Sequence, residues 1–180
     1  MSDLSKLTPG KWQIDAAHSS VTFSVRHLMI SKVKGSFNDF SGTIVIDEDP
    51  LKSTVEARVG LASVNTGDEQ RDAHLKGSDF FDTDTYPDMV FTSTGLRQKG
   101  GDYLLDGELS ILGVTKPVTF QLEFEGVNTD PWGNTKAGFS ATTEINRKDW
   151  GMSYNAALET GGVLIGEKAK IELDIEAAHD

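Results

Sequence analysis

Apolar and polar residues alternate with a period of two along almost the whole of this 180-residue chain. In the first clear example, Val21, Phe23 and Val25 share one face of a segment whose other face carries Thr22 and Ser24. Similar segments begin near Phe40, Val55, Met89, Leu105, Val118, Ala137 and Val163. A period of two places the apolar side chains on one side of a β-strand. The pattern therefore predicts an all-β fold of roughly eight strands, either a sandwich or a barrel.

Strand length favours a ligand-holding barrel over a plain sandwich. The last alternating segment, Val163–Ile175, would span ~43 Å at ~3.3 Å per residue, whereas strands of about five or six residues are usual. An eight-stranded barrel is also near the size that holds one small ligand. A tall, narrow, apolar lumen suits an extended hydrocarbon chain. The alternation alone would also describe a solidly filled barrel, so both interpretations stay open at this point.

One segment in the middle of the chain departs from the strand pattern and predicts a helix. Thr66 to Glu69 fits a capping box, with Thr66 as the N-cap and Glu69 at the third helical position. We expect the helix to run to about Lys76 and to stop at Gly77. The chain contains no internal repeat, low-complexity segment or linker, so residues 1–180 are predicted to form a single domain.

Composition narrows the classes of function. The chain contains no cysteine, which excludes disulfides, thiolate metal sites and a thiol nucleophile. Its 28 acidic and 17 basic residues give a net charge of −11, and such a surface repels nucleic acids and anionic lipid head groups. No apolar run approaches ~18 residues, so we expect no transmembrane segment. Residues 1–11 show no signal-peptide pattern, which predicts a cytoplasmic location, although a trimmed exported form would look the same.

Several segments, in this order, carry a resemblance to a known family. They are Asp15–Ser19, Val25–Met29, Val33–Phe37, Ala62–Leu75, Phe80–Asp82, Tyr86–Pro87, Phe91–Thr94, Leu112–Val118 and Ile145–Met152. Together they resemble the YceI family of lipocalin-like, polyisoprenoid-binding proteins. The resemblance implies an extended antiparallel eight-stranded barrel with a short helix packed against it. It also implies a lipid of the polyprenyl or isoprenoid-quinone type in the lumen, no other cofactor, and often a homodimer. Some relatives carry a secretory signal peptide, and this chain departs from them there.

In such a barrel the apolar core and the wall around the ligand are the same surface. We therefore expect the lipid to contact the large inward side chains, and each buried CH₂ contributes roughly 0.8 kcal/mol. The residues predicted to line the lumen are Val21, Phe23, Val25, Phe37, Phe40, Phe80, Phe81, Phe91, Leu109, Phe120, Phe139, Trp150 and Ile165.

Four polar residues are predicted to lie near the lipid head group, namely His18, His27, Arg71 and His74. The histidines either donate hydrogen bonds to the head group or pin strand to helix. Arg71 shares a helix face with His74, and its alternative role is to dock the helix by pairing with an acid such as Asp82. A metal site would need imidazoles within about 2.0–2.1 Å of one ion. The sequence spacing matches no local ligand pattern, so no metal is expected.

No catalytic motif stands out. The chain has neither a Gly-x-Ser-x-Gly elbow nor a glycine-rich phosphate loop before a helix. We therefore predict a binding protein and no catalytic residues. Two alternatives remain beside this prediction. One is a metal-dependent or histidine-based enzyme acting at His18, His27 and His74, and the other is a structural or stress protein with a filled barrel.

Overall fold

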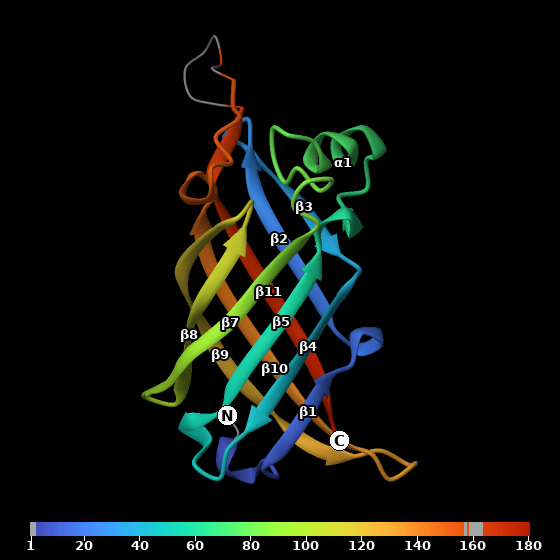
Figure 1. Cartoon of the computed structure of the whole chain (residues 1–180), viewed down its shortest axis with the longest axis vertical. Helices are drawn as coiled ribbons and strands as arrows, with labels where there is room; N and C mark the ends of the chain where they lie inside the picture. The colour runs from blue at the N-terminus through green and yellow to red at the C-terminus, as the bar shows by residue number, and fades with distance from the viewer. Residues whose placement is uncertain (1–2, 157, 159–163) are drawn as a thin grey trace.

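The computed structural model of the protein describes residues 3–156, 158 and 164–180. Its strands form one antiparallel sheet that curls into a tall barrel (Figure 1). The order of the strands around the ring is β1-β4-β5-β7-β8-β9-β10-β11, and pairing between β1 and β11 closes it. The strands are β1 (Gly10–Ile14), β2 (Ser20–His27), β3 (Ser31–Phe37), β4 (Phe40–Ile46), β5 (Thr54–Gly60), β6 (Val64–Asn65), β7 (Asp88–Lys99), β8 (Asp102–Ile111), β9 (Val114–Thr129), β10 (Thr135–Asn146) and β11 (Ile165–His179).

The barrel has eight strand positions, and three of them are each occupied by two short strands that lie in line. β1 and β2 lie in line along β11, because Ile14 pairs with Ala177 and Ser20 pairs with Asp174. β3 and β4 continue each other in the same way, as do β5 and β6. The short 3₁₀ turns η2 (Ala16–His18) and η4 (Leu61–Ser63) make two of the interruptions. Each of the eight positions therefore pairs with the positions before and after it in sequence, which is the topology of an up-and-down barrel.

The predicted all-β, eight-stranded lipocalin-like barrel is confirmed. The long strands are present as well. β9 has 16 residues, about 50 Å when extended. The last strand differs from its prediction, since it runs to His179. The sequence Glu-Ala-Ala-His at 176–179 breaks the alternation of large apolar residues, yet it still pairs with β1 and β10. Val163, where that strand was predicted to start, lies outside the described residues.

The predicted helix is present as α1 (Glu69–Lys76), but its cap was predicted wrongly. Asp68 is the N-cap, and its carboxylate accepts hydrogen bonds from the backbone N–H groups of Gln70 and Arg71. Thr66 instead donates its hydroxyl to Asp72 at 2.6 Å. The capping contacts are therefore made by the Asp68 carboxylate, two residues closer to the helix than the predicted cap Thr66. Gly77 ends the helix, as predicted.

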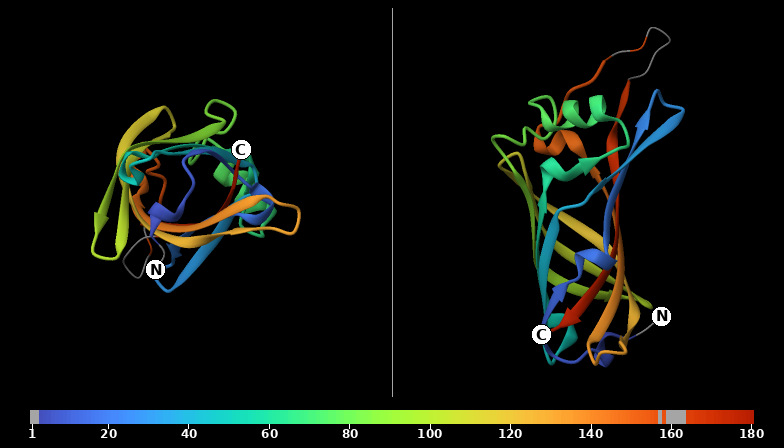
Figure 2. Two further views of the ribbon diagram at one scale, coloured as in Figure 1. Left: turned by 90° about the horizontal axis from the view of Figure 1, so that it is seen from below. Right: turned by 90° about the vertical axis from the view of Figure 1, so that its right-hand side faces the viewer.

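The two ends of the barrel are covered differently. At the lower end, where both termini lie (Figure 1), the 3₁₀ turn η1 (Leu4–Lys6) packs against Trp12 and Tyr103. Leu4 is buried there, and its N–H donates to the Tyr103 hydroxyl at 3.3 Å. At the upper end, α1 lies to one side of the barrel mouth and the β2–β3 hairpin to the other (Figure 2, right). None of the helices in the described part of the chain is long and apolar enough to cross a membrane.

Candidate functional site

A cavity of about 150 Å³ occupies the lower and middle part of the barrel. Every strand of the closed ring contributes apolar side chains to its wall, so it lies on the barrel axis. The contributing residues include Ile14, Ile44, Val55, Phe91, Leu105, Phe120, Phe139 and Ile171. A cavity that can hold one water molecule needs only about 10–15 Å³. The side chains of this barrel therefore leave room along the axis, in contrast to a filled barrel.

A second cavity, of about 310 Å³, lies above the first. Strands β2, β3 and β11 form one side of it, and α1 with the turn that follows forms another. Val21, Met89 and Ile171 line both cavities. The lower and upper cavities therefore share part of their wall at this level and follow one another along the barrel. Together they have the tall, narrow and apolar shape that the strand lengths predicted.

Inward-facing glycines keep this space from being filled. A Cβ on Gly42 would stand 2.6 Å from Cδ1 of Ile14, and one on Gly107 would collide with the ring of Phe91. The missing side chains allow Ile14 and Phe91 to lie against the wall. Large apolar residues thus contribute surface to the lumen without crossing it.

The structure brings the predicted lumen residues together around these two cavities, with one exception. Those that line the lower cavity are Val21, Phe40, Phe91, Leu109, Phe120 and Phe139. Those that line the upper cavity are Val21, Phe23, Val25, Phe37, Phe80, Phe81 and Ile165. Trp150 lines neither of them. It belongs to the 3₁₀ turn η5 (Arg147–Trp150) and is 2% exposed, and its indole N–H donates to the carbonyl of Leu109 at 2.9 Å. Its role in the structure is packing.

Of the predicted head-group residues, His27, Arg71 and His74 line the upper cavity and His18 does not. His18 lies in η2, where the alternation is interrupted and the chain turns out of the barrel wall. Its side chain is exposed, with Nδ1 2.8 Å from the Asp15 carboxylate and 3.4 Å from that of Glu176. The predicted placement of His18 beside the head group is therefore wrong, and the three-histidine group needed for the enzyme alternative is not formed.

The surroundings of His18 explain its electrostatics. The hydrogen bond that the His18 ring donates to the Asp15 carboxylate raises the pKa of His18. The same hydrogen bond, followed by one from Lys136 at 3.1 Å, lowers the pKa of Asp15 to about 2. Within the described residues, Asp15, His18 and Glu176 form one group whose ligand atoms are close enough for a metal ion. Two cationic side chains already pair with the Asp15 carboxylate, so the cluster is accounted for as an ion-pair network.

Basic side chains collect at the upper cavity. Its described lining includes Arg26, His27, Arg71, His74 and Arg147 but no aspartate or glutamate. This contrasts with the net charge of −11 of the chain as a whole. A cavity with this lining favours a ligand group that accepts hydrogen bonds or carries negative charge.

Two of these basic side chains, Arg71 and His74, have partners that the sequence did not reveal. The predicted partner of Arg71, Asp82, is wrong, because the guanidinium donates to Thr66 Oγ1 at 2.8 Å and to the Thr66 carbonyl at 2.9 Å. This contact holds α1 to the chain before it. His74 lies 2.9 Å from the carboxylate of Asp79 and packs edge-on against Tyr154.

Arg147 was not among the predicted head-group residues, yet it lines the upper cavity. Its side chain is 4% exposed and donates to the carbonyls of Met152 at 2.6 Å and Gly166 at 2.9 Å. Burial lowers the pKa of Arg147. The sequence did offer one signal for this placement. Arg147 follows directly after Asn146, the last residue of β10, at the end of that strand nearest the barrel mouth.

Comparisons with known proteins agree with this architecture. The YceI-like domain matches residues 12–177. A UPF0312 protein of Staphylococcus aureus (strain MSSA476) is 41% identical over 166 residues, which cover 90% of this chain and 94% of the relative. The YCEI protein of Campylobacter jejuni is 32% identical with a TM-score of 0.73, covering 86% of this chain and 90% of that one.

Two more distant structures share the fold. BcnA of Burkholderia cenocepacia is 21% identical with a TM-score of 0.79, covering 91% of this chain and 98% of that one. A polyisoprenoid binding domain from Saccharophagus degradans is 18% identical with a TM-score of 0.72, covering 94% and 98%. With the barrel, its lumen and a match over nearly the whole sequence, the chain belongs to the YceI family.

Proposed function

We propose that this protein binds a long-chain isoprenoid lipid, of the polyprenyl or isoprenoid-quinone type, for sequestration or transport. The observation that carries the proposal is the pair of apolar cavities that follow one another along the barrel axis and share the lining residues Val21, Met89 and Ile171. The polyisoprenoid binding domain of Saccharophagus degradans is only 18% identical to this chain, so its likeness supports the fold and not the ligand. Family membership and the lumen of this chain support the choice of ligand.

The tail of the lipid would occupy the lower cavity and the passage above it. Its wall is made of aliphatic and aromatic side chains contributed by all the strands of the ring. Each CH₂ group moved there from water contributes roughly 0.8 kcal/mol, so a tail of many carbons needs few polar contacts for tight binding. The buried Leu4, Trp12 and Tyr103 close the lower end. We therefore propose that the tail enters from above.

The head group would lie in the upper cavity, near His27, Arg71 and His74. These three side chains carry N–H groups, of which Arg71 and His74 also bond to Thr66 and Asp79. No described lining residue supplies a carboxylate. Quinone carbonyls and phosphate oxygens both accept such hydrogen bonds, whereas a cationic head group would be repelled. The shape of the cavity thus supports a long tail, and its charge supports an acceptor or anionic head.

Extraction of the bound lipid tests the proposal. Protein purified without detergent is extracted with organic solvent, and the extract is analysed by mass spectrometry against an extract of the His27→Leu and Met89→Trp variants. We expect a stoichiometric isoprenoid from the parent protein and a reduced amount from the variants. A parent protein that carries no lipid, and that fails to take up an isoprenoid quinone or a polyprenyl phosphate when delipidated, would contradict the proposal.

The oligomeric state is part of the proposal, since the family resemblance implies a homodimer. Light scattering on a sizing column measures it directly. We expect a mass near twice the 19.6 kDa of the chain. A mass of one chain at all concentrations would refute the dimer and leave lipid binding untouched, because both cavities lie within a single chain.

A further inference from the structure

The tip of the β2–β3 hairpin exposes three consecutive apolar side chains. Leu28, Met29 and Ile30 are 38%, 58% and 81% exposed. Leu28 and Met29 also have positive φ angles of 53° and 64°, a conformation that favours glycine or asparagine and strains bulky residues. Neither the exposure nor the strain stabilises the fold. A contiguous apolar tip of this kind marks a surface that meets a partner or a membrane.

Basic side chains flank this tip. Arg26 and Lys32 are paired across the hairpin, and Lys34 lies two inter-strand pairs further from the tip, on the same face. All three are exposed, and none forms an ion pair with another residue that the structure describes. Residues 16–38 contain no aspartate or glutamate, although the chain has 28. The hairpin is therefore a local exception to the acidic surface.

The hairpin also borders the upper cavity. Its residues Val25, His27 and Val33 line that cavity. The N–H of Leu28 donates to the carbonyl of Leu164, another lining residue, at 2.9 Å. An object bound at the tip would thus lie beside the mouth through which a lipid reaches the lumen.

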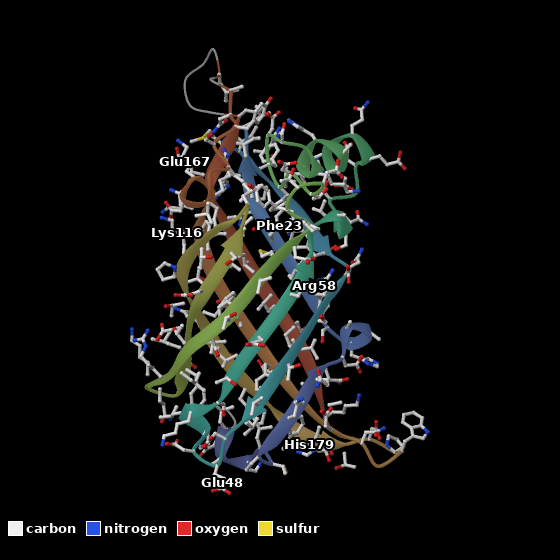
Figure 3. All side chains as sticks on the ribbon, in the orientation of Figure 1. Phe23, Glu48, Arg58, Lys116, Glu167 and His179 are labelled. Atoms are coloured by element: carbon white, nitrogen blue, oxygen red, sulfur yellow. The ribbon has the colours of Figure 1, made fainter. Side chains whose placement is uncertain are left out.

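The charges on other parts of the molecule determine which side of the protein would face an anionic surface. The start of α1 carries Asp68, Glu69 and Asp72 on the other side of the mouth (Figure 2, right). At the far end of the barrel, the turn of Asp47, Glu48 and Asp49 is acidic (Figure 3). An anionic surface repels both regions and attracts the hairpin. This asymmetry singles out the hairpin side of the mouth.

We propose that the β2–β3 hairpin docks the protein on an anionic lipid membrane. The side chains of Leu28, Met29 and Ile30 enter the boundary between head groups and acyl chains, and Arg26, Lys32 and Lys34 contact the anionic head groups. Docking in this orientation brings the upper cavity to the membrane, where an isoprenoid can pass between bilayer and barrel. This docking role is additional to the proposed function, and docking does not require a bound isoprenoid.

Co-sedimentation with vesicles tests the proposal on delipidated protein. We expect binding to phosphatidylcholine vesicles that contain phosphatidylglycerol, weaker binding to phosphatidylcholine alone, and loss of binding as salt is raised. Replacing Lys32 and Lys34 together by glutamine should weaken binding to the anionic vesicles roughly 25-fold, at about fivefold for each charge removed. Replacing Met29 and Ile30 together by serine should abolish binding to both kinds of vesicle.

Trp132 provides a matched control. It is 83% exposed at the tip of the β9–β10 hairpin, at the opposite end of the barrel, so Trp132→Ser should leave vesicle binding unchanged. Docking at the β2–β3 hairpin is refuted if the parent protein ignores anionic vesicles, or if Trp132→Ser weakens binding as much as the hairpin variants do. It is also refuted if the hairpin variants change the mass in solution without changing vesicle binding, which would assign the tip to a contact between copies. Isoprenoid uptake from detergent, measured on the same variants, reports separately on the proposed function.

Discussion

The ring of Phe23 lies directly over Gly35, its partner on the neighbouring strand, in the upper half of the barrel (Figure 3). A Cβ on Gly35 would stand 2.5 Å from Cζ of Phe23, which is closer than real Cβ contacts come. The nearest atom of another residue would be Cγ2 of Thr66, at 3.0 Å. Because Gly35 has no side chain, the Phe23 ring has room to lie against the wall of the upper cavity.

Gly35→Ala should force the Phe23 ring into the upper cavity, since the colliding atoms belong to side chains that can move. We expect isoprenoid occupancy to fall severalfold and the free energy of unfolding to drop by about 1–3 kcal/mol. Quantitative mass spectrometry and denaturant unfolding measure the two effects. Gly95→Ala is the control, because a Cβ there meets nothing within 4 Å. Equal occupancy in both variants would show that the ring does not limit the cavity.

Met89→Trp should place a bulky ring between the two cavities, since Met89 lines both of them. A long isoprenoid would then lose its place in the lower cavity, and we expect its affinity to fall at least about tenfold, the equivalent of two buried CH₂ groups. Fluorescence displacement with a long and a short apolar probe measures this loss. The adjacent Val90 is 40% exposed on the other face of the strand, so Val90→Trp should bind like the parent. If Met89→Trp binds the long probe unchanged, the two cavities do not serve one ligand.

The sequence predicted the barrel because the alternation persists through nearly every strand, and a period of two admits few other folds. It predicted the lumen lining for the same reason, since residues such as Phe91 and Phe139 share the inward face. His18 and Trp150 were misplaced because both lie in 3₁₀ turns, where the alternation no longer tells which way a side chain points. Arg147 was missed for a related reason, because it is the first residue of the 3₁₀ turn η5, just beyond the alternation of β10.

His27→Leu should weaken binding through the head group while leaving the tail contacts in place. His27 lines the upper cavity, and leucine keeps its apolar contacts but removes a hydrogen-bond donor. One lost hydrogen bond corresponds to about 0.5–1.5 kcal/mol, or up to roughly tenfold in affinity. Titration with an isoprenoid quinone should show this loss, and titration with a hydrocarbon that has no head group should not. His18→Leu, on the outer wall, should affect neither ligand, and a loss in that variant would contradict the assignment of the head group to the upper cavity.

The ion pair of His18 with Asp15 should give the protein a defined dependence of stability on pH. Asp15 has a folded-state pKa of about 2, below its ordinary value of 3.8, so its contribution is present above 3.8 and is lost as the pH falls through about 2. His18 has a raised pKa, so its contribution is complete below its ordinary value of 6.5 and is lost as the pH rises through the raised value. The pair should therefore stabilise the fold most between about pH 4 and 6.5. An NMR titration of the His18 ring should report the raised pKa, and Asp15→Asn should lower it, because the hydrogen bond to the Asp15 carboxylate is the largest cause of the shift. An unchanged His18 pKa in Asp15→Asn would mean that Glu176, 3.4 Å away, holds the imidazolium instead.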